Sequence, residues 1–224
     1  NDPTREQRRE ISLKVIEYYD HEIKKSAKDS ERLIFQIERL YYQLDVSLVD
    51  GYEQFKTLFK DLESGRNIEL AALALDILLK DRPLPRALQA FIDAYYKGWV
   101  LVRRQLIKPA TRHVTEGWQR VLVEGSKTEP VPQRQRLLDL EVNRRKGELR
   151  TLLGYCYRMA GNWNAAVEEY DQGRLLHEEL IKTLQQQEPR DEEAIREAVA
   201  RLAETLNDIA NLLRMQGHME RARR

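Results

Sequence analysis

The chain has 224 residues, of which 42% are hydrophobic and 33% are charged, with 10 Gly and 7 Pro. It is too apolar for a disordered chain and richer in charge than an average globular domain, so the composition favours long helices with wide solvated faces. Its 38 Lys and Arg nearly balance its 37 Asp and Glu, and the net charge of +1 implies no bulk attraction to nucleic acid or to a membrane surface.

The single cysteine, Cys156, excludes an internal disulfide and is typical of a reducing compartment, so we expect a cytoplasmic protein. No apolar run approaches the roughly 20 residues that cross a bilayer, and no signal peptide opens the sequence, so no membrane partner is expected. Because the sequence begins with Asn1 rather than Met, we expect a fragment or a processed chain.

Four helical patterns fill the first part of the chain. Asp2, as a capping residue, and Pro3, at the first helical position, predict the start of the first helix. Ser30 predicts the cap of a second helix, and a third is expected from about Ser47 to Leu62. The fourth, IELAALALDILLK, is apolar nearly all round, which predicts the most buried helix of this half.

Proline interrupts the middle of the chain. The two prolines of DRPLPR, residues 81–86, cannot lie inside one helix. We therefore expect a new helix from about residue 85 to 107, an interruption at Lys108 and Pro109, and a shorter helix through Val121.

The segment EGSKTEPVPQ, residues 124–133, holds Gly, Ser and two Pro, and it predicts a boundary between an N-terminal helical subdomain, 1–123, and a second domain, 124–224. Sustained period-two alternation is absent from the sequence, so we expect an all-α fold. Three longer helices are expected after the boundary, at about residues 133–159, 163–187 and 192–215.

One short phrase occurs twice: RMAGNWNAA at 158–166 returns as RMQGHMERA at 214–222, with glycines 56 residues apart. The pattern predicts a helical hairpin in which a small residue admits the second helix, a glycine ends the first helix in a left-handed cap, and a large apolar residue fills the gap beyond the turn. The residues expected to pack in this way are Gly154, Tyr157, Gly161, Trp163, Ala166, Ala210, Leu213, Gly217, Met219 and Ala222.

Through LLGYCYRMAGNWNAAVEEYDQG and DIANLLRMQGHMERAR, residues from about 147 to 224 resemble the tetratricopeptide repeat family. The resemblance implies stacked antiparallel helical hairpins in a right-handed α-solenoid. Family repeats are about 34 residues long, so the 56-residue interval implies longer helices. Arg150 departs from the family pattern, because a bulky apolar residue is usual there.

The same resemblance implies a concave groove that binds a protein or peptide. The residues at the groove positions are Glu148, Thr151, Tyr155, Arg158, Glu204, Asn207, Asn211 and Arg214. Amide and guanidinium groups at such places can hold a partner's backbone or carboxylate. The second copy is cut short after Ala222, so we expect further repeats in the parent protein and self-association through the truncated C-terminal face.

Residues 1–123 resemble, through ERLIFQIERLYYQLDVSLVDGYEQF, the helical linker regions of multidomain bacterial signalling ATPases of the STAND type. The resemblance implies a regulatory arm of such an ATPase. It implies no nucleotide site in this chain, because no glycine-rich phosphate loop is present.

Motifs for bond chemistry are lacking in the sequence. The four histidines have no metal-ligand spacing, and no histidine lies near Cys156 in sequence, so neither a metal, a cofactor nor a catalytic residue is expected. The leading interpretation is a non-catalytic scaffold or sensor segment. The alternatives are a nucleic-acid binder using the basic region 101–120, with Trp99 and Trp118 nearby, and an enzyme whose site is assembled from distant residues.

Overall fold

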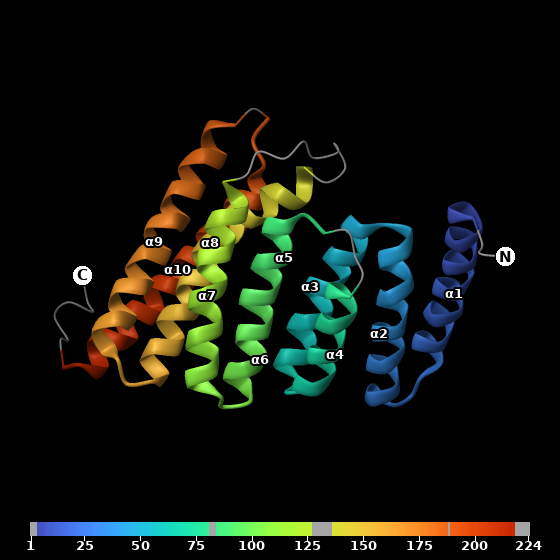
Figure 1. Cartoon of the computed structure of the whole chain (residues 1–224), viewed down its shortest axis with the longest axis horizontal. Coiled ribbons are helices and arrows are strands. Elements are labelled where there is room, and N and C mark those ends of the chain that lie inside the picture. Colours follow the sequence, from blue (N-terminus) through green and yellow to red (C-terminus); the bar gives the residue numbers. More distant parts are fainter. Residues whose placement is uncertain (1–3, 81–83, 127–135, 188, 218–224) are drawn as a thin grey trace. The chain divides into compact units, whose positions relative to one another are not determined.

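The structure is a computed structural model of the chain. It describes residues 4–80, 84–126, 136–187 and 189–217. Within these ranges every regular element is a helix and no strand occurs, which confirms the all-α prediction (Figure 1). No helix in the described part of the chain is long and apolar enough to cross a membrane.

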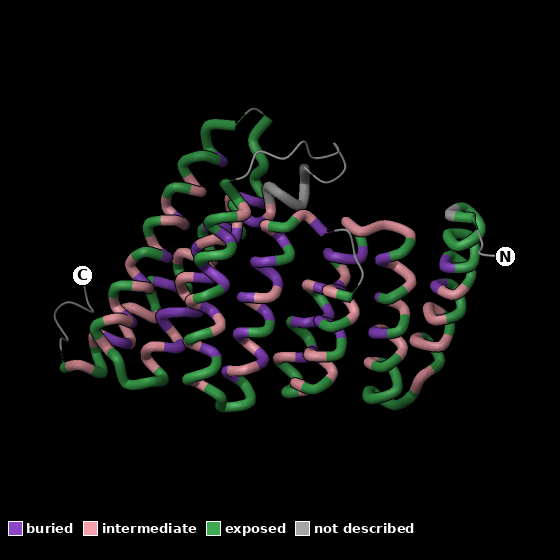
Figure 2. The backbone as a smooth tube through the Cα atoms, viewed as in Figure 1, coloured by how far each residue is buried: buried purple, intermediate pink, exposed green. Residues whose placement is uncertain are grey.

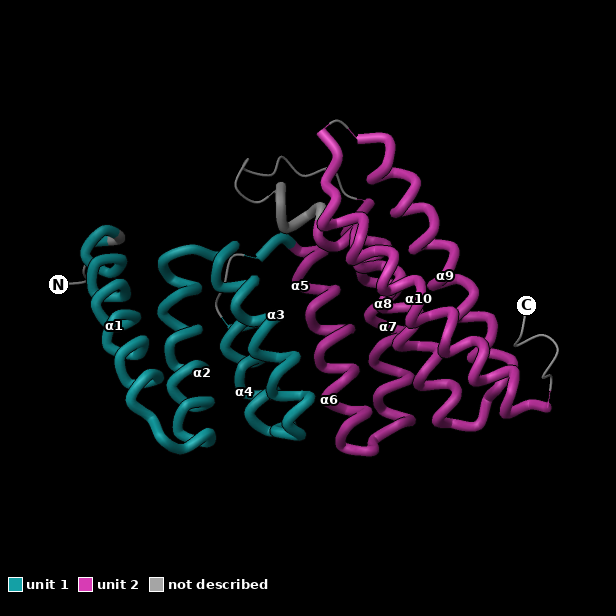
Figure 3. The backbone as a smooth tube through the Cα atoms, turned by 180° about the vertical axis from the view of Figure 1, so that it is seen from behind, with its two compact units in different colours: residues 1–85 teal, residues 86–224 magenta. Residues whose placement is uncertain are grey.

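The chain divides into two compact units, residues 1–85 and 86–224 (Figure 3). In the first unit each helix packs against the next, and the second helix also contacts the fourth. Its elements are α1 (Arg5–Lys25), α2 (Asp29–Val46), α3 (Leu48–Ser64) and α4 (Ile68–Leu79). Tyr52 and Phe55 of α3 are fully buried in its core.

Capping explains where some of these helices begin. The first helix starts after Thr4, which forms a capping box with Gln7, while the expected Asp2 and Pro3 lie outside the described residues. The Ser47 hydroxyl accepts from the Asp50 N–H and caps α3, which runs close to the predicted range of Ser47 to Leu62. The Ser30 prediction was wrong, because α2 begins one residue earlier, at Asp29, without a side-chain cap.

In the second unit a continuous helical segment is followed by four longer helices. Its elements are α5 (Arg86–Ile92), the π-helical segment η1 (Asp93–Lys97), α6 (Gly98–Arg103), α7 (Ile107–Gly125), α8 (Arg136–Met159), α9 (Trp163–Gln186) and α10 (Glu192–Met215). The last three match the predicted ranges to within three residues. The helix α8 packs against α7, α9 and α5, and α9 packs against α10.

The boundary expected within 124–133 therefore differs from the observed one, which falls between Pro85 and Arg86. Breaker residues mark where a helix ends, and they do not show whether the flanking helices pack together. Here they do, because α7 and α8 share a core: Arg150 of α8 lies over the Trp118 ring of α7, with 4.2 Å between its guanidinium carbon and the ring centroid.

The predicted interruption at Lys108 and Pro109 was also misplaced. The break lies at Arg104 to Leu106, where Gln105 adopts a left-handed φ of 61°, and Pro109 lies in the first turn of α7. Proline is tolerated there because the first N–H groups of a helix have no intrahelical acceptor.

The hairpin between α8 and α9 has the expected local structure. Gly161 has a φ of 77°, its N–H donates to the Arg158 carbonyl, and the Asn162 N–H donates to the Tyr157 carbonyl, which together form a Schellman cap. The other glycine, Gly217, has a φ of 76°. In this unit buried residues lie along the α5–η1–α6 segment and on one face each of α7, α8 and α9 (Figure 2).

Glycines let α9 approach α8 closely. A Cβ on Gly154 would lie 2.9 Å from the Tyr170 ring, and one on Gly147 would lie 2.6 Å from the His177 ring. Both distances are too short for a real Cβ. The aromatic side chains of α9 therefore lie directly on the backbone of α8, which fixes their positions.

Candidate functional site

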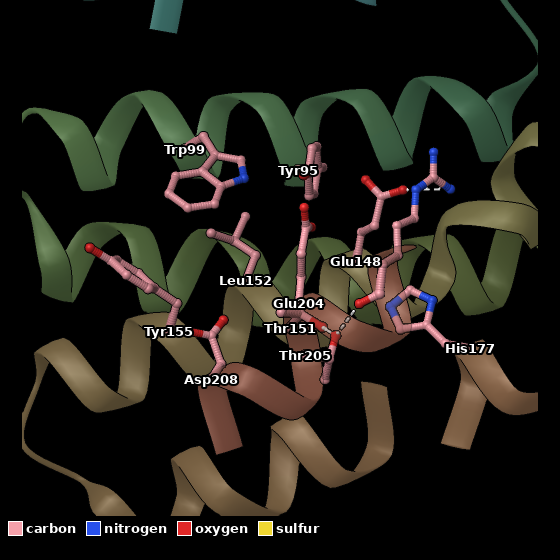
Figure 4. A pocket seen from close by; sticks show the side chains of 11 residues that line it. Tyr95, Trp99, Glu148, Thr151, Leu152, Tyr155, His177, Glu204, Thr205 and Asp208 are labelled. Atoms are coloured by element: carbon pink, nitrogen blue, oxygen red, sulfur yellow. Dashed lines mark hydrogen bonds and ion pairs between the residues drawn. The ribbon is translucent and has the colours of Figure 1, made fainter. Parts of the chain in front are cut away.

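A cavity of about 190 Å³ lies inside the second unit, between the η1–α6 segment and helices α8, α9 and α10. Figure 4 shows Trp99 and Tyr155 toward one end and His177 at the other. Each of the five elements contributes at least one side chain to the lining. The site is therefore assembled from residues that are as many as 113 positions apart, from Tyr95 to Asp208.

Tyr95 reaches the cavity from the π-helical segment η1, whose C-cap residue Gly98 donates its N–H to the Ala94 and Tyr95 carbonyls. The opposite side of this segment lies against α7, where a Cβ on Gly117 would be 2.3 Å from the Ala94 Cβ. π-Helical turns are frequent at functional sites. Here the turn places the buried Tyr96 beside Tyr95, with ring centroids 5.1 Å apart.

A buried ionic chain borders the cavity. Arg145, 6% exposed, donates to both carboxylate oxygens of Glu148, with Nε–Oε1 at 2.9 Å and Nη2–Oε2 at 2.6 Å, and to the Tyr96 hydroxyl at 2.5 Å. On the other side, Arg201 of α10 approaches Glu148, with Nη1–Oε1 at 2.8 Å. The carboxylate thus joins α8 to α10.

These contacts determine the ionisation of Glu148. Burial is the largest single influence and disfavours the charged form. The guanidinium groups of Arg145 and Arg201 outweigh it, so the pKa of Glu148 lies below its usual value. The Arg145 guanidinium also lies over the rings of Phe91, Tyr95 and Tyr96, at 5.1, 5.0 and 5.3 Å from their centroids.

His177 closes one end of the cavity. Its side chain is 1% exposed, and its Nδ1 is buried without a hydrogen-bond partner among the described residues. Burial lowers the pKa of His177; the carboxylate of Glu148 opposes this change, and Arg201 adds to it. The imidazole is therefore held in its neutral form, in which one ring nitrogen accepts hydrogen bonds.

Two hydroxyls line the floor between these groups. Thr151 of α8 and Thr205 of α10 share a hydrogen bond, with 3.1 Å between their Oγ1 atoms. Each hydroxyl also lies within hydrogen-bond distance of the carbonyl four residues earlier, Gly147 for Thr151 and Arg201 for Thr205. The pair is a second polar link between α8 and α10.

At the aromatic end, Trp99 and Tyr155 have ring centroids 5.4 Å apart, and the Arg158 guanidinium lies 4.8 Å from the Tyr155 centroid. Asp208 is 3.9 Å from Arg158, measured from Oδ1 to Nη1. Burial raises the pKa of Asp208, and Arg158 offsets this only in part. The second acidic side chain, Glu204, forms no hydrogen bond or ion pair with any residue that the structure describes.

Four of the eight predicted groove residues line this cavity: Glu148, Thr151, Tyr155 and Glu204. Arg158 contacts it indirectly, through Asp208. The other three do not line it, and Arg214 donates to the Asn211 side chain instead. The repeat pattern did not indicate the remaining lining residues, which are Tyr95, Trp99, Leu152, His177, Arg201, Thr205 and Asp208.

The residues predicted to pack the repeat lie in several environments. Gly154 and Ala166 are buried, and Tyr157 and Trp163 are partly buried against a cluster of Ala166, Tyr170 and Leu212. Half-buried positions in α10 are occupied by Ala210 and Leu213, whereas Met219 and Ala222 lie outside the described residues.

Other candidate groups have structural environments. Cys156 is fully buried, and burial raises the pKa of its thiol to about 12, so a reactive thiolate is disfavoured. The described residues contain no cluster of His, Cys, Asp and Glu that could hold a metal ion. In the basic region a shallow hollow contains Lys108, Arg112 and His113, but Arg112 pairs with Glu116 and His113 Nε2 lies 2.9 Å from the Asp93 carbonyl oxygen.

The comparisons with known proteins assign no family. No family model matches the chain, and neither a curated protein nor a solved structure matches it. The resemblances to tetratricopeptide repeats and to signalling ATPases therefore stay predictions.

Proposed function

We propose that this chain is a non-catalytic interaction segment in which residues 86–224 bind a peptide or protein through the cavity between α8 and α10. The proposal includes a tetratricopeptide-like solenoid, with α8 and α10 as the groove-lining helices. It also includes a cytoplasmic location, and a regulatory arm of a signalling ATPase is one setting in which such a segment would serve.

One observation carries the proposal: the cavity gathers aromatic, hydroxyl and carboxylate side chains from five elements, and half of the groove residues expected from the repeat pattern line it. Pockets for drug-sized ligands are about 300–1,000 Å³. A cavity of about 190 Å³ is smaller, and it fits one amino-acid side chain better than a cofactor.

Selection from a random peptide library against the whole chain tests the proposal. Tyr155→Ala removes a ring from the cavity wall and should weaken selected peptides roughly tenfold or more, as truncating an aromatic hot spot does. Tyr18→Ala, at a residue 56% exposed on α1, is the matched control and should leave their affinity unchanged. Failure to enrich any peptide, or peptides that bind the Tyr155→Ala chain equally well, would refute the proposal.

For the self-association expected through the C-terminal face, the proposed surface is the exposed side of α10. On α10, Val199 and Leu206 are 47% and 45% exposed and lie seven residues apart, two turns along one helix face. Exposed apolar stripes of this kind support contact with another helix. The partner of this face stays a prediction.

A further inference from the structure

The carboxylates around the cavity differ in how well they are neutralised. Glu148 lies between Arg145 and Arg201, at 2.6 and 2.8 Å, and is fully compensated. Asp208 has only the distant Nη1 of Arg158 at 3.9 Å, and Glu204 has no partner in the described part of the chain. Glu204 therefore leaves one carboxylate without an internal counter-ion in the wall of the cavity, and Asp208 is only weakly paired.

His177 gives an independent indication of the ligand. Its side chain is 1% exposed and lines the cavity, yet its Nδ1 makes no hydrogen bond within the described ranges. A buried polar atom without a partner costs free energy, and such atoms in native structures call for an explanation. The Nδ1 atom is closed off from solvent and therefore from a ligand, but the neutral ring carries no positive charge that could neutralise an anion at this end of the cavity.

The donors and acceptors of the wall point in the same direction. Its guanidinium, Arg201, is already engaged by Glu148, Glu197 and the Arg144 carbonyl. The charged acceptors that remain are the carboxylates of Glu204 and Asp208. A ligand with several N–H donors and a positive charge complements this wall, whereas a carboxylate would meet uncompensated negative charge.

The apolar part of the lining limits the shape of such a ligand. Trp99, Leu152 and Tyr155 surround the aromatic end, where they can cover methylene groups (Figure 4). The chain already places its own arginines on these rings: Arg103 lies 5.5 Å from the Trp99 centroid and Arg158 lies 4.8 Å from that of Tyr155. Both rings are therefore surfaces on which a guanidinium or its alkyl stem is stable.

We propose that this cavity takes the cationic side chain of a partner, with arginine as its best-fitting form, paired to Glu204 and Asp208 and covered by Trp99 and Tyr155. This inference rests on the function proposed above and names the anchor residue of the partner. It reverses the expectation from the repeat pattern that amide and guanidinium groups hold a carboxylate, because Asn207, Asn211 and Arg214 lie outside the cavity.

The test uses the full chain with nitrogen-15 in its three tryptophan indoles, observed by NMR. The probes are N-acetyl-arginine methylamide, its neutral citrulline analogue and N-acetyl-glutamate methylamide. The Trp99 cross-peak should shift saturably with the arginine probe and much less with the other two. The cross-peaks of Trp118 and Trp163, which do not line the cavity, should stay in place and report an intact fold.

Glu204→Gln keeps the shape of the wall and removes its unpaired charge. It should weaken the arginine probe roughly fivefold, equivalent to the upper value of about 1 kcal/mol for a solvent-exposed ion pair. Glu193→Gln, the same substitution at an exposed residue near the start of α10, should leave the affinity unchanged. A Trp99 signal that does not move, that moves equally with the citrulline or glutamate probe, or that titrates identically in Glu204→Gln overturns the inference.

These outcomes are separable from those of the peptide selection. Selected peptides that depend on Tyr155 but carry an acidic or apolar anchor would leave the proposed function standing and overturn the cationic anchor. Conversely, an arginine probe that binds in a Glu204-dependent way while no peptide is enriched would support the cavity chemistry and remove the peptide-binding function.

Discussion

Replacing Arg145 by methionine tests how far the buried ionic chain stabilises the second unit. Methionine keeps an unbranched apolar stem but removes the bonds to Glu148 and to the Tyr96 hydroxyl. Removing one partner of a buried ion pair costs about 3–5 kcal/mol, because the other charge remains buried. Arg201 still compensates Glu148 at 2.8 Å, so we expect about 3 kcal/mol, the lower end of that range.

Urea unfolding followed by far-UV circular dichroism measures this loss. The control is Arg112→Met, which breaks an Arg–Glu pair whose side chains are 82% and 57% exposed and whose length, 2.8 Å, is close to the 2.6 Å of Arg145 and Glu148. Solvent screens such a pair, so the control should be indistinguishable from the unsubstituted chain. A loss below about 1 kcal/mol for Arg145→Met, or one equal to the control, would refute the assigned role of the ionic chain.

The same variant carries a pH signature. The pKa of Glu148 is lower in the folded chain than its usual value, because Arg145 and Arg201 outweigh the effect of burial. The stability that ionised Glu148 contributes is therefore fully present above the unfolded pKa of about 4.3, and it is lost as the pH falls through the folded pKa. Arg145→Met should weaken this acid dependence, and an unchanged profile below that pH would contradict the assignment.

Three further outcomes follow from local geometry. Trp163→Ala should lower the free energy of unfolding in urea by about 2 kcal/mol. This is less than the 3–5 kcal/mol of a fully buried aromatic residue, because Trp163 is only partly buried. A loss under about 0.5 kcal/mol would show that its side chain does not fill the gap in the hairpin. Gly161 and Gln105 both have a left-handed φ, which favours glycine. Gly161→Ala should therefore lower the free energy of unfolding by about 1 kcal/mol, and Gln105→Gly should raise it by up to about 1 kcal/mol. Changes of the opposite sign would contradict the cap geometry. His177 faces Glu148 and Arg201, and burial lowers its pKa, so the free energy of unfolding should fall as the pH drops below about 6.5. His177→Gln should weaken this pH dependence. An unchanged dependence of the free energy of unfolding between pH 7 and 5 would exclude His177 as its cause.

The helices and hairpin glycines were predictable because their signals are local. A left-handed residue after a helical pattern favours glycine, and Gly161 and Gly217 both have this conformation. Arg66 and Gln105 end helices in the same conformation without being glycines, so no residue type announced those turns. The domain boundary depends on contacts between α7 and α8, about which the breaker residues between them carry no information.

Four of the eleven residues that line the candidate site were predictable for a related reason. Helical periodicity places Glu148, Thr151 and Tyr155 on one face of α8, and that face does line the cavity. On α10 the lining residues are Arg201, Glu204, Thr205 and Asp208, a face rotated from the one that the repeat pattern indicated. The rotation is set by packing against α9, and the entry of Tyr95 depends on a π-helical turn; neither is encoded in local spacing.

Apolar and polar contacts are separated along α10. At its start, Ala194 and Ala198 form an apolar cluster with Leu184 of α9, and near its end Leu212 packs with Ala166 and Tyr170. Its middle turns contribute polar side chains to the cavity and contact α8 through the Glu148 carboxylate and the Thr151 hydroxyl. Apolar contacts at both ends hold the helix on α9, and between them Arg201 and Thr205 bind α8. Removing Arg201 would leave the buried Glu148 carboxylate with one counter-ion fewer, so of the polar residues that these turns contribute to the cavity only the exposed Glu204 can vary at little cost to the fold.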